Sequence, residues 1–261
     1  MRYVRVFFAC LWLIPVYAAT AAAKPSCERP LTLALHDHGL LYSSDTGTGI
    51  DKDIADELIR RSGCKINVSV MPRARIWQLI ESGALDFSLS GITNAERDKF
   101  AAFAWYFSNK YYLLVRKDAV VIKQADFERK SALQLGVIRG FRYSTKANEL
   151  VDRLINDNRV SYATGLEPLY QLLLANRIQG MIFEPFDYPV VSSGAIREVT
   201  TSFEFGDPPV PHGLIMSRAS VTPAEQAKWS ALIEAMRADG SVLKIFEKYF
   251  EPELARTMAQ F

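Results

Sequence analysis

The sequence alternates short apolar segments with amphipathic segments, and it does so in two successive blocks. Such alternation is typical of a mainly parallel β-sheet with helices on both faces. The strand-like segments of the two blocks are residues 31–35, 65–70, 85–89, 133–138, 160–163 and 179–183. Helices are expected at residues 51–59, 76–80, 143–156, 167–175, 223–238 and 242–250. We therefore predict an α/β fold made of two doubly wound parts with mainly parallel sheets.

Two extended segments predict how these parts are connected. Once the leader described below is removed, the chain is too long for one such sheet and suits two of about 100 residues each. Segments near residues 111–118 and 208–216 flank the second block. We predict two lobes joined by two crossing strands, with residues 24–115 and 213–261 in lobe 1 and residues 116–212 in lobe 2. Ligands bind beyond the carboxyl ends of strands in open α/β sheets, so the cleft between the lobes is the expected site.

The amino-terminal residues have the pattern of a secretory signal peptide. Arg2 and Arg5 precede an apolar segment at residues 6–16, and three alanines end at Ala23. The alternative is a membrane anchor, but the apolar segment is short of the roughly 20 residues needed to span a bilayer. We predict cleavage near Ala23 and export from the cytoplasm. Residues before Cys27 lack the lipoprotein pattern, so a soluble product is expected.

Charge and composition exclude several classes of function. The leader carries two of the 31 basic residues, so the mature chain balances 29 of them against 29 acidic residues. No basic run interleaved with aromatic residues remains, and nucleic acid is therefore not an expected partner. The histidines and cysteines show no metal-ligand spacing, and we predict neither a metal nor a cofactor. His36 and His38 flank Asp37 at the end of a strand, and we expect them to face opposite sides.

Two cysteines remain after removal of the leader, which contains Cys10. Cys27 and Cys64 each stand just before a predicted strand. If those strands are parallel neighbours, their first residues lie side by side, and an oxidising compartment favours a disulfide between the two cysteines. The alternative is a pair of buried thiols.

The segment from Glu81 to Arg97 predicts a site for a small anion. A helix ends at Gly83, the buried strand at residues 85–89 follows, and a turn of small residues then leads to Arg97. Backbone N–H groups at a helix start, together with a guanidinium, bind carboxylate or phosphate groups. We therefore predict a receptor for such a group.

Five short motifs resemble those of the periplasmic solute-binding proteins of the amino-acid type, family 3. The motifs are residues 49–54, 79–86, 96–97, 135–140 and 239–250. The resemblance covers nearly the whole mature chain and implies a type II periplasmic-binding fold that closes over its ligand. It further implies a monomeric, non-catalytic protein in the periplasm that presents a small solute to the membrane permease of an ABC importer.

The resemblance also assigns roles to individual residues. It implies that Arg97 forks onto the ligand carboxylate and that main-chain amides at Ser90 and at the Arg142–Tyr143 helix start add further donors. It implies that Glu184, which follows the strand at residues 179–183, binds the ligand ammonium. The chain departs from the family pattern at His36, Ile92, Asn94 and Ala95. These changes put an ordinary α-amino acid in doubt as the ligand.

Three further residues are candidates from their positions alone. Arg73 opens a helix, where a cation opposes the helix dipole, so a contact in the cleft would explain it, whereas Arg75 is expected on the outer face. His36 ends the first strand and is expected to touch the ligand. Tyr42 is expected either to form an aromatic wall of the site or to pack in a loop.

Two other functions remain open on the same scaffold. Some relatives are dehydratases of cyclic carboxylic acids, and here Glu184 would be the general acid, with its proton retained by burial. The chain could also be a ligand sensor that is not tied to transport, since sensing and transport need the same closure.

Overall fold

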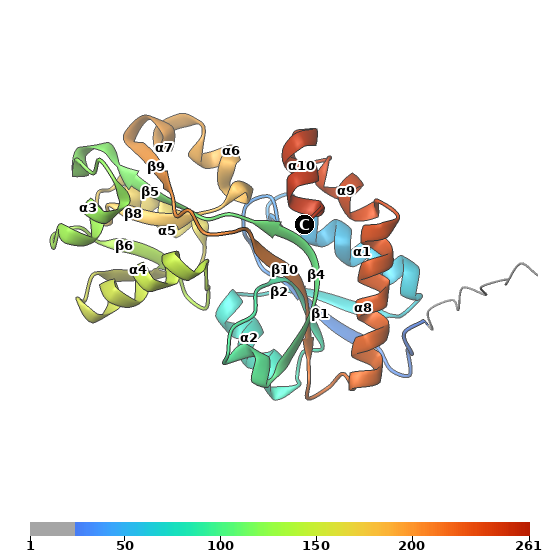
Figure 1. Ribbon diagram of the computed structural model, residues 1–261. Helices are drawn as coiled ribbons and strands as arrows, with labels where there is room; N and C mark the ends of the chain where they lie inside the picture. The colour runs from blue at the N-terminus through green and yellow to red at the C-terminus, as the bar shows by residue number, and fades with distance from the viewer. Residues whose placement is uncertain (1–23) are drawn as a thin grey trace, which may run out of the picture.

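The computed structural model describes residues 24–261, so the predicted signal peptide at residues 1–23 lies outside the described residues. Figure 1 shows two lobes, each built on its own five-stranded sheet, with two extended segments passing between them. The predicted fold class is confirmed, because helices flank two separate α/β sheets. Within the described residues, no helix is long and apolar enough to cross a bilayer.

The sheet of lobe 1 combines strands from both ends of the chain, in the order β2-β1-β3-β10-β4. Its strands are β1 (Leu31–Leu35), β2 (Ile66–Val70), β3 (Phe87–Gly91), β4 (Ala101–Asn109) and β10 (Val210–Ser217). One face is covered by α1 (Ile50–Ser62), α8 (Pro223–Ala238), α9 (Ser241–Phe246) and α10 (Pro252–Ala259). The other face is covered by α2 (Arg73–Ser82).

The sheet of lobe 2 has the order β7-β6-β8-β5-β9. Its strands are β5 (Tyr112–Arg116), β6 (Leu135–Ile138), β7 (Val160–Ala163), β8 (Gly180–Phe183) and β9 (Thr200–Glu204). One face packs against α3 (Gln124–Arg129) and α4 (Thr145–Asn156). The other packs against α5 (Leu166–Leu174), α6 (Tyr188–Val191) and α7 (Gly194–Val199). Short 3₁₀ turns complete the chain at η1 (Arg97–Lys99), η2 (Lys117–Ala119) and η3 (Pro185–Asp187).

The two lobes exchange strands at their junction. β5 follows β4 after two residues, and each belongs to a different sheet. The return segment leads from β9 into β10. Both sheets are mixed, because β10 and β5 pair antiparallel with their neighbours while the other pairs are parallel. The chain passes from one sheet to the other between β4 and β5 and again between β9 and β10. Both points lie a few residues from the predicted lobe boundaries at 115 and 213. Those boundaries stay a prediction.

The first helix shows how the sequence forms these elements. Ile50, Ile54 and Leu58 recur every four residues and face the core of lobe 1. The helix ends at Gly63, whose φ of 73° is a left-handed conformation that glycine adopts without strain. Asp51, the first acidic residue of this segment, does not cap the helix. Gly49 is the capping residue, and Asp51 is fully buried within the first turn.

One side chain of the lobe 2 segment penetrates the core of lobe 1. Phe186 lies in η3, directly after β8, yet it is fully buried among lobe 1 residues. Its ring meets Phe107 edge to face, with ring centroids 5.3 Å apart. The Leu40 N–H donates to the Phe186 carbonyl at 3.0 Å. This aromatic anchor links the lobes next to the crossing strands.

The predicted disulfide is present. β1 and β2 are parallel neighbours in which Leu31 pairs with Ile66. Their amino-terminal ends therefore lie side by side, and Cys27 and Cys64 are joined with Cα atoms 5.2 Å apart.

We predict that replacing both cysteines by serine lowers the free energy of unfolding by about 2–4 kcal/mol, because the bond restricts the unfolded chain. Urea denaturation of the mature protein with Cys27→Ser and Cys64→Ser measures this loss. The wild-type protein under reducing conditions should match the variant. An unchanged denaturation midpoint, or free thiols in the oxidised wild-type protein, would contradict the assignment.

Candidate ligand-binding site

A small cavity lies in the cleft where the two lobes meet, and we call it the central cavity. It has a volume of about 20 Å³. Its walls are His36, Leu41, Arg73, Ser90, Ile92, Arg97, Tyr111, Phe141, Arg142, Glu184 and His212. The structure thus brings together six of the eight predicted ligand-binding residues from distant parts of the chain.

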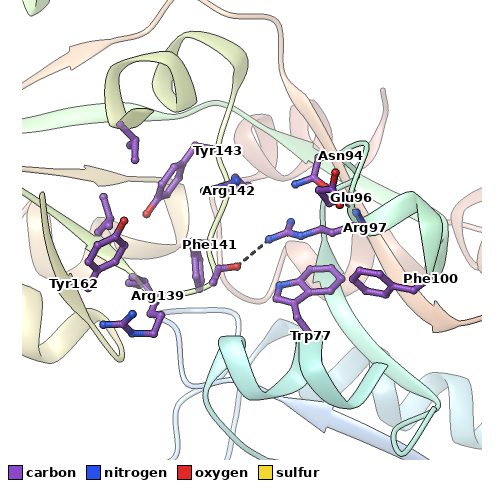
Figure 2. A pocket seen from close by; sticks show the side chains of 14 residues that line it. Trp77, Asn94, Glu96, Arg97, Phe100, Arg139, Phe141, Arg142, Tyr143 and Tyr162 are labelled. Carbon is purple, nitrogen blue, oxygen red and sulfur yellow. Dashed lines mark hydrogen bonds between the residues drawn. The ribbon is translucent and has the colours of Figure 1, made fainter. Parts of the chain in front are cut away.

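Two larger cavities share the Phe141 side chain with the central cavity. The first, of about 400 Å³, is lined by Trp77, Asn94, Glu96, Arg97, Phe100, Val137, Ile138, Arg139, Gly140, Phe141, Arg142, Tyr143, Val151 and Tyr162. We call it the arginine–aromatic chamber, and Figure 2 shows its lining. The second, of about 790 Å³, includes Asp37, Asp45, Glu167 and Asp187 in its lining, and we call it the acidic chamber.

Arg97 bridges the lobes, and no carboxylate of residues 24–261 pairs with it. It opens η1, and its guanidinium donates to the Ile92 carbonyl at 2.9 Å and to the Gly140 carbonyl of lobe 2 at 2.8 Å (Figure 2). The same group lies 3.9 Å from the centre of the Trp77 ring. Only 7% of Arg97 is exposed. Burial, followed by the nearby Arg73 charge, lowers the pKa of Arg97 to about 9.

Arg73 is a second buried guanidinium in the same cavity. It begins α2 and donates to the Leu89 carbonyl at 2.9 Å and to the Ser90 carbonyl at 2.8 Å. Burial lowers the pKa of Arg73 to about 10, and the charge of Asp51 opposes that shift. Within residues 24–261, neither Arg73 nor Arg97 forms an ion pair, and this leaves the centre of the cleft rich in positive charge.

The backbone of Ser90 is fixed by a buried polar network. Its N–H donates to the Tyr106 hydroxyl at 2.9 Å, and its own hydroxyl donates to the Asp51 carboxylate at 2.6 Å. Burial raises the pKa of Asp51 to about 6, although these hydrogen bonds oppose the shift. The predicted free amide donor at Ser90 is therefore already bonded. No regular α-helix follows β3 either, because the turn leads into the three residues of η1 and then into β4.

Glu184 joins the lobes instead of standing free. Its carboxylate lies 2.8 Å from His38 Nε2, and its second oxygen accepts a hydrogen bond from the Asn109 amide. Burial alone would raise the pKa of Glu184, but the hydrogen bond and charge of His38 bring it below the usual value. An ammonium group of a ligand would have to compete with His38 and Asn109 for this carboxylate.

Two histidines and one phenylalanine form an aromatic cluster at the cavity wall. The rings of His36 and His38 lie 5.5 Å apart, and the Phe141 ring lies 4.9 Å from His38. The prediction that the histidines face opposite sides is wrong, since residues two apart in an extended chain share a face. Burial, followed by the charge of Arg73, holds the pKa of His36 well below its usual value, which favours the neutral ring.

The remaining predicted residues lie at the edge of the site or outside it. Arg142 is exposed and lines both the central cavity and the arginine–aromatic chamber. No helix starts at Tyr143, because α4 begins at Thr145 and the Tyr143 N–H donates to the Asn148 side chain at 3.0 Å. Tyr42 packs against the lobe 1 core and lines none of these cavities.

Sequence reasoning missed several residues of the cleft. Phe141 follows Gly140 in a motif that was recognised, but nothing in the spacing showed that its ring crosses to lobe 1. His212 hydrogen-bonds to the Tyr111 hydroxyl at 2.8 Å, a contact between residues 101 positions apart in the chain. Trp77 showed only the apolar periodicity of α2. Contacts of this kind depend on lobe closure, which no local pattern encodes.

Comparison with protein families decides the class of this chain. Residues 38–252 match the family described as bacterial extracellular solute-binding proteins, family 3. The chain belongs to this family. The match covers the segments of both lobes that line the cleft, including every wall residue of the central cavity except His36. A comparison with curated protein sequences found no match.

Solved structures show the same fold at low sequence identity. An ancestral arginine-binding protein bound to arginine is 20% identical, with a TM-score of 0.72 over 86% of this chain and 100% of that chain. ArtJ, an arginine-, lysine-, histidine-binding protein from Geobacillus stearothermophilus, is 17% identical, with a TM-score of 0.73 over 88% and 99%. An ABC uptake transporter substrate-binding protein from Streptococcus pneumoniae with bound histidine is 16% identical, with a TM-score of 0.70 over 85% and 92%. The chain thus has the fold of amino-acid-binding solute-binding proteins.

The His38–Glu184 contact makes stability depend on pH. Glu184 has a lowered pKa, so its contribution is present above the usual value of 4.5 and is lost as the pH falls through its folded pKa. His38 has a raised pKa, so its contribution is present below 6.5 and is lost as the pH rises through its folded pKa. Both groups are therefore charged and paired between these two values.

We predict that Glu184→Gln lowers the free energy of unfolding by about 2 kcal/mol near pH 5.5 and by less near pH 9. Urea denaturation at both pH values measures the difference. The control is Glu204→Gln, which removes the exposed Lys110–Glu204 pair and should have little effect at either pH. Equal losses for Glu184→Gln at both pH values would contradict the pairing.

Proposed function

We propose that the mature protein captures a small carboxylate-bearing solute in the cleft and delivers it, in the periplasm, to the permease of an ABC importer. The observation that carries this proposal is Arg97, a buried guanidinium between the lobes that donates to two carbonyl groups and forms no ion pair within the described residues. The role in uptake is supported by the family that the chain matches. It is also supported by the fold shared with the substrate-binding protein of an ABC uptake transporter from Streptococcus pneumoniae.

The charges of the cleft favour an anionic ligand. A buried cation is costly unless a charge of opposite sign and hydrogen bonds compensate it. Arg97 has donors on a planar fork, which suits the two oxygens of a carboxylate. The exposed Arg142 adds positive charge from lobe 2. A carboxylate would therefore be bound by groups from both lobes and would favour the closed state.

Contacts between the lobes also stabilise the closed state. Arg97 reaches the Gly140 carbonyl, His38 reaches Glu184, and Leu40 reaches the Phe186 carbonyl. A ligand that binds only the closed form shifts the population towards it by its differential affinity for the two forms. Such a shift is what a permease would need to distinguish loaded from empty protein.

The state of Glu184 favours binding over the dehydratase alternative. A general acid must hold its proton near neutral pH, which requires a raised pKa. The pKa of Glu184 is instead lowered by His38, and both carboxylate oxygens already have partners. We therefore keep binding without turnover as the proposed function.

We predict that Arg97→Ala weakens binding of a carboxylate ligand about 100-fold, because a bidentate, charge-assisted contact is lost. A thermal-shift screen of amino acids, organic acids and cyclic acids first identifies the ligand, and calorimetry then measures its affinity. Arg97→Lys keeps the charge without the fork and should weaken binding by less.

The matched control is Arg75→Ala, since Arg75 is exposed on the same lobe, lines none of the three cavities and hydrogen-bonds to the Gln78 side chain. It should bind like the wild-type protein. Circular dichroism checks that each variant is folded. Wild-type affinity in folded Arg97→Ala protein would reject Arg97 as the anchor, and conversion of the ligand by the wild-type protein would revive the enzyme alternative.

A further inference from the structure

We infer that the arginine–aromatic chamber is the site of the bound solute and that the solute is a small aromatic carboxylate. This inference rests on the proposed function and names its ligand class. The chamber lies between the lobes, with Trp77, Phe100 and Arg97 on one side and Phe141, Arg142 and Tyr143 on the other (Figure 2). Its volume of about 400 Å³ is within the range of small-molecule sites.

The charges of the chamber select an anion. Arg97, Arg139 and Arg142 line it, and none of them forms an ion pair within the described residues. The one acidic lining residue, Glu96, is paired with Lys99 at 2.7 Å. A carboxylate entering the chamber therefore meets three guanidinium groups and no free acid.

The walls of the chamber select a ring. Five aromatic side chains line it, namely Trp77, Phe100, Phe141, Tyr143 and Tyr162. Tyr162 is 46% exposed and lies beneath the Arg139 guanidinium, which is 4.9 Å from its ring centre. Aromatic pairs contribute free energy beyond that of the area they bury. These walls would favour a planar ring over an aliphatic chain of similar length.

One buried donor in the wall has no acceptor. The Trp77 side chain is 8% exposed, and its indole N–H makes no hydrogen bond within residues 24–261. An unpaired buried donor costs free energy, which a ligand oxygen would recover. The Arg97 guanidinium and this N–H are therefore two donor groups of lobe 1 in the chamber wall.

The other two cavities are less suited to such a ligand. The central cavity, of about 20 Å³, is too small for a ring, because the Phe141 side chain packs against His36 and His38. Gly140 fixes this packing, since a Cβ atom there would lie 2.9 Å from the Ala74 backbone. The acidic chamber carries four acidic residues in its lining, Asp37, Asp45, Glu167 and Asp187, against one cation, Arg73, and this balance disfavours a carboxylate. The arginine–aromatic chamber is therefore the cavity next to Arg97 that has room for an aromatic carboxylate.

The test uses the mature protein with benzoate, phenylacetate and 4-hydroxybenzoate as probes. Calorimetry and thermal shift are compared with benzamide, which has the ring without the charge, and with acetate, which has the charge without the ring. We expect at least one aromatic acid to bind about tenfold or more tightly than both controls. Equal binding of the acid and either control would overturn the inference.

Two variants test whether the probe binds in the arginine–aromatic chamber. Arg139→Ala and Tyr162→Ala change exposed side chains, and each should weaken binding of the aromatic acid about tenfold. The matched control, Arg177→Ala, changes an exposed arginine of the same lobe that lines none of the three cavities and should not. If both chamber variants bind the aromatic acid as tightly as the wild-type protein does, the chamber is not the binding site.

The outcome also separates this inference from the proposed function. If an aliphatic amino acid binds in an Arg97-dependent manner and no aromatic acid does, the inference fails and the proposed function stands. If no carboxylate of any kind binds the folded protein, both fail.

Discussion

The cleft of this protein depends on two buried guanidinium groups that donate to backbone carbonyls and form no ion pair within the described residues. Arg73 is fixed at the start of α2 by the carbonyls of Leu89 and Ser90, and Arg97 extends from lobe 1 to the carbonyl of Gly140 in lobe 2. Carbonyl groups orient these cations but do not neutralise them. Burial consequently lowers the pKa values of both arginines, and a ligand carboxylate would recover part of that cost.

Three contacts of different kinds between the lobes stabilise the closed state. Phe186 anchors the lobe 2 segment in the aromatic core of lobe 1 close to the crossing strands. Glu184 adds a buried pair with His38, and Arg97 adds the contact nearest the arginine–aromatic chamber. The aromatic anchor does not depend on charge, whereas the other two contacts do. Binding of an anion therefore affects the two charged contacts between the lobes and not the aromatic anchor.

The fold was largely predictable from sequence, but the site was predictable only in part. The strand–helix alternation identified most of the longer elements but not β4, and the position of both cysteines before parallel strands predicted their disulfide. Short elements such as α6 and β9 have too few residues for a clear periodicity. Arg97 and Glu184 could be placed in the cleft by motif. The partners of Glu184 and the position of the Phe141 ring could not, because they arise from contacts between lobes that no local pattern encodes.

The central claim is that Arg97 anchors the anionic group of a ligand between the lobes. A crystal structure of the mature protein with a bound carboxylate tests it most directly, through the distances from the Arg97 guanidinium to the carboxylate oxygens. The account predicts two such contacts at about 2.7–2.9 Å, with groups of lobe 2 on the same ligand. A carboxylate bound elsewhere, with Arg97 still bonded only to the Ile92 and Gly140 carbonyls, would contradict it.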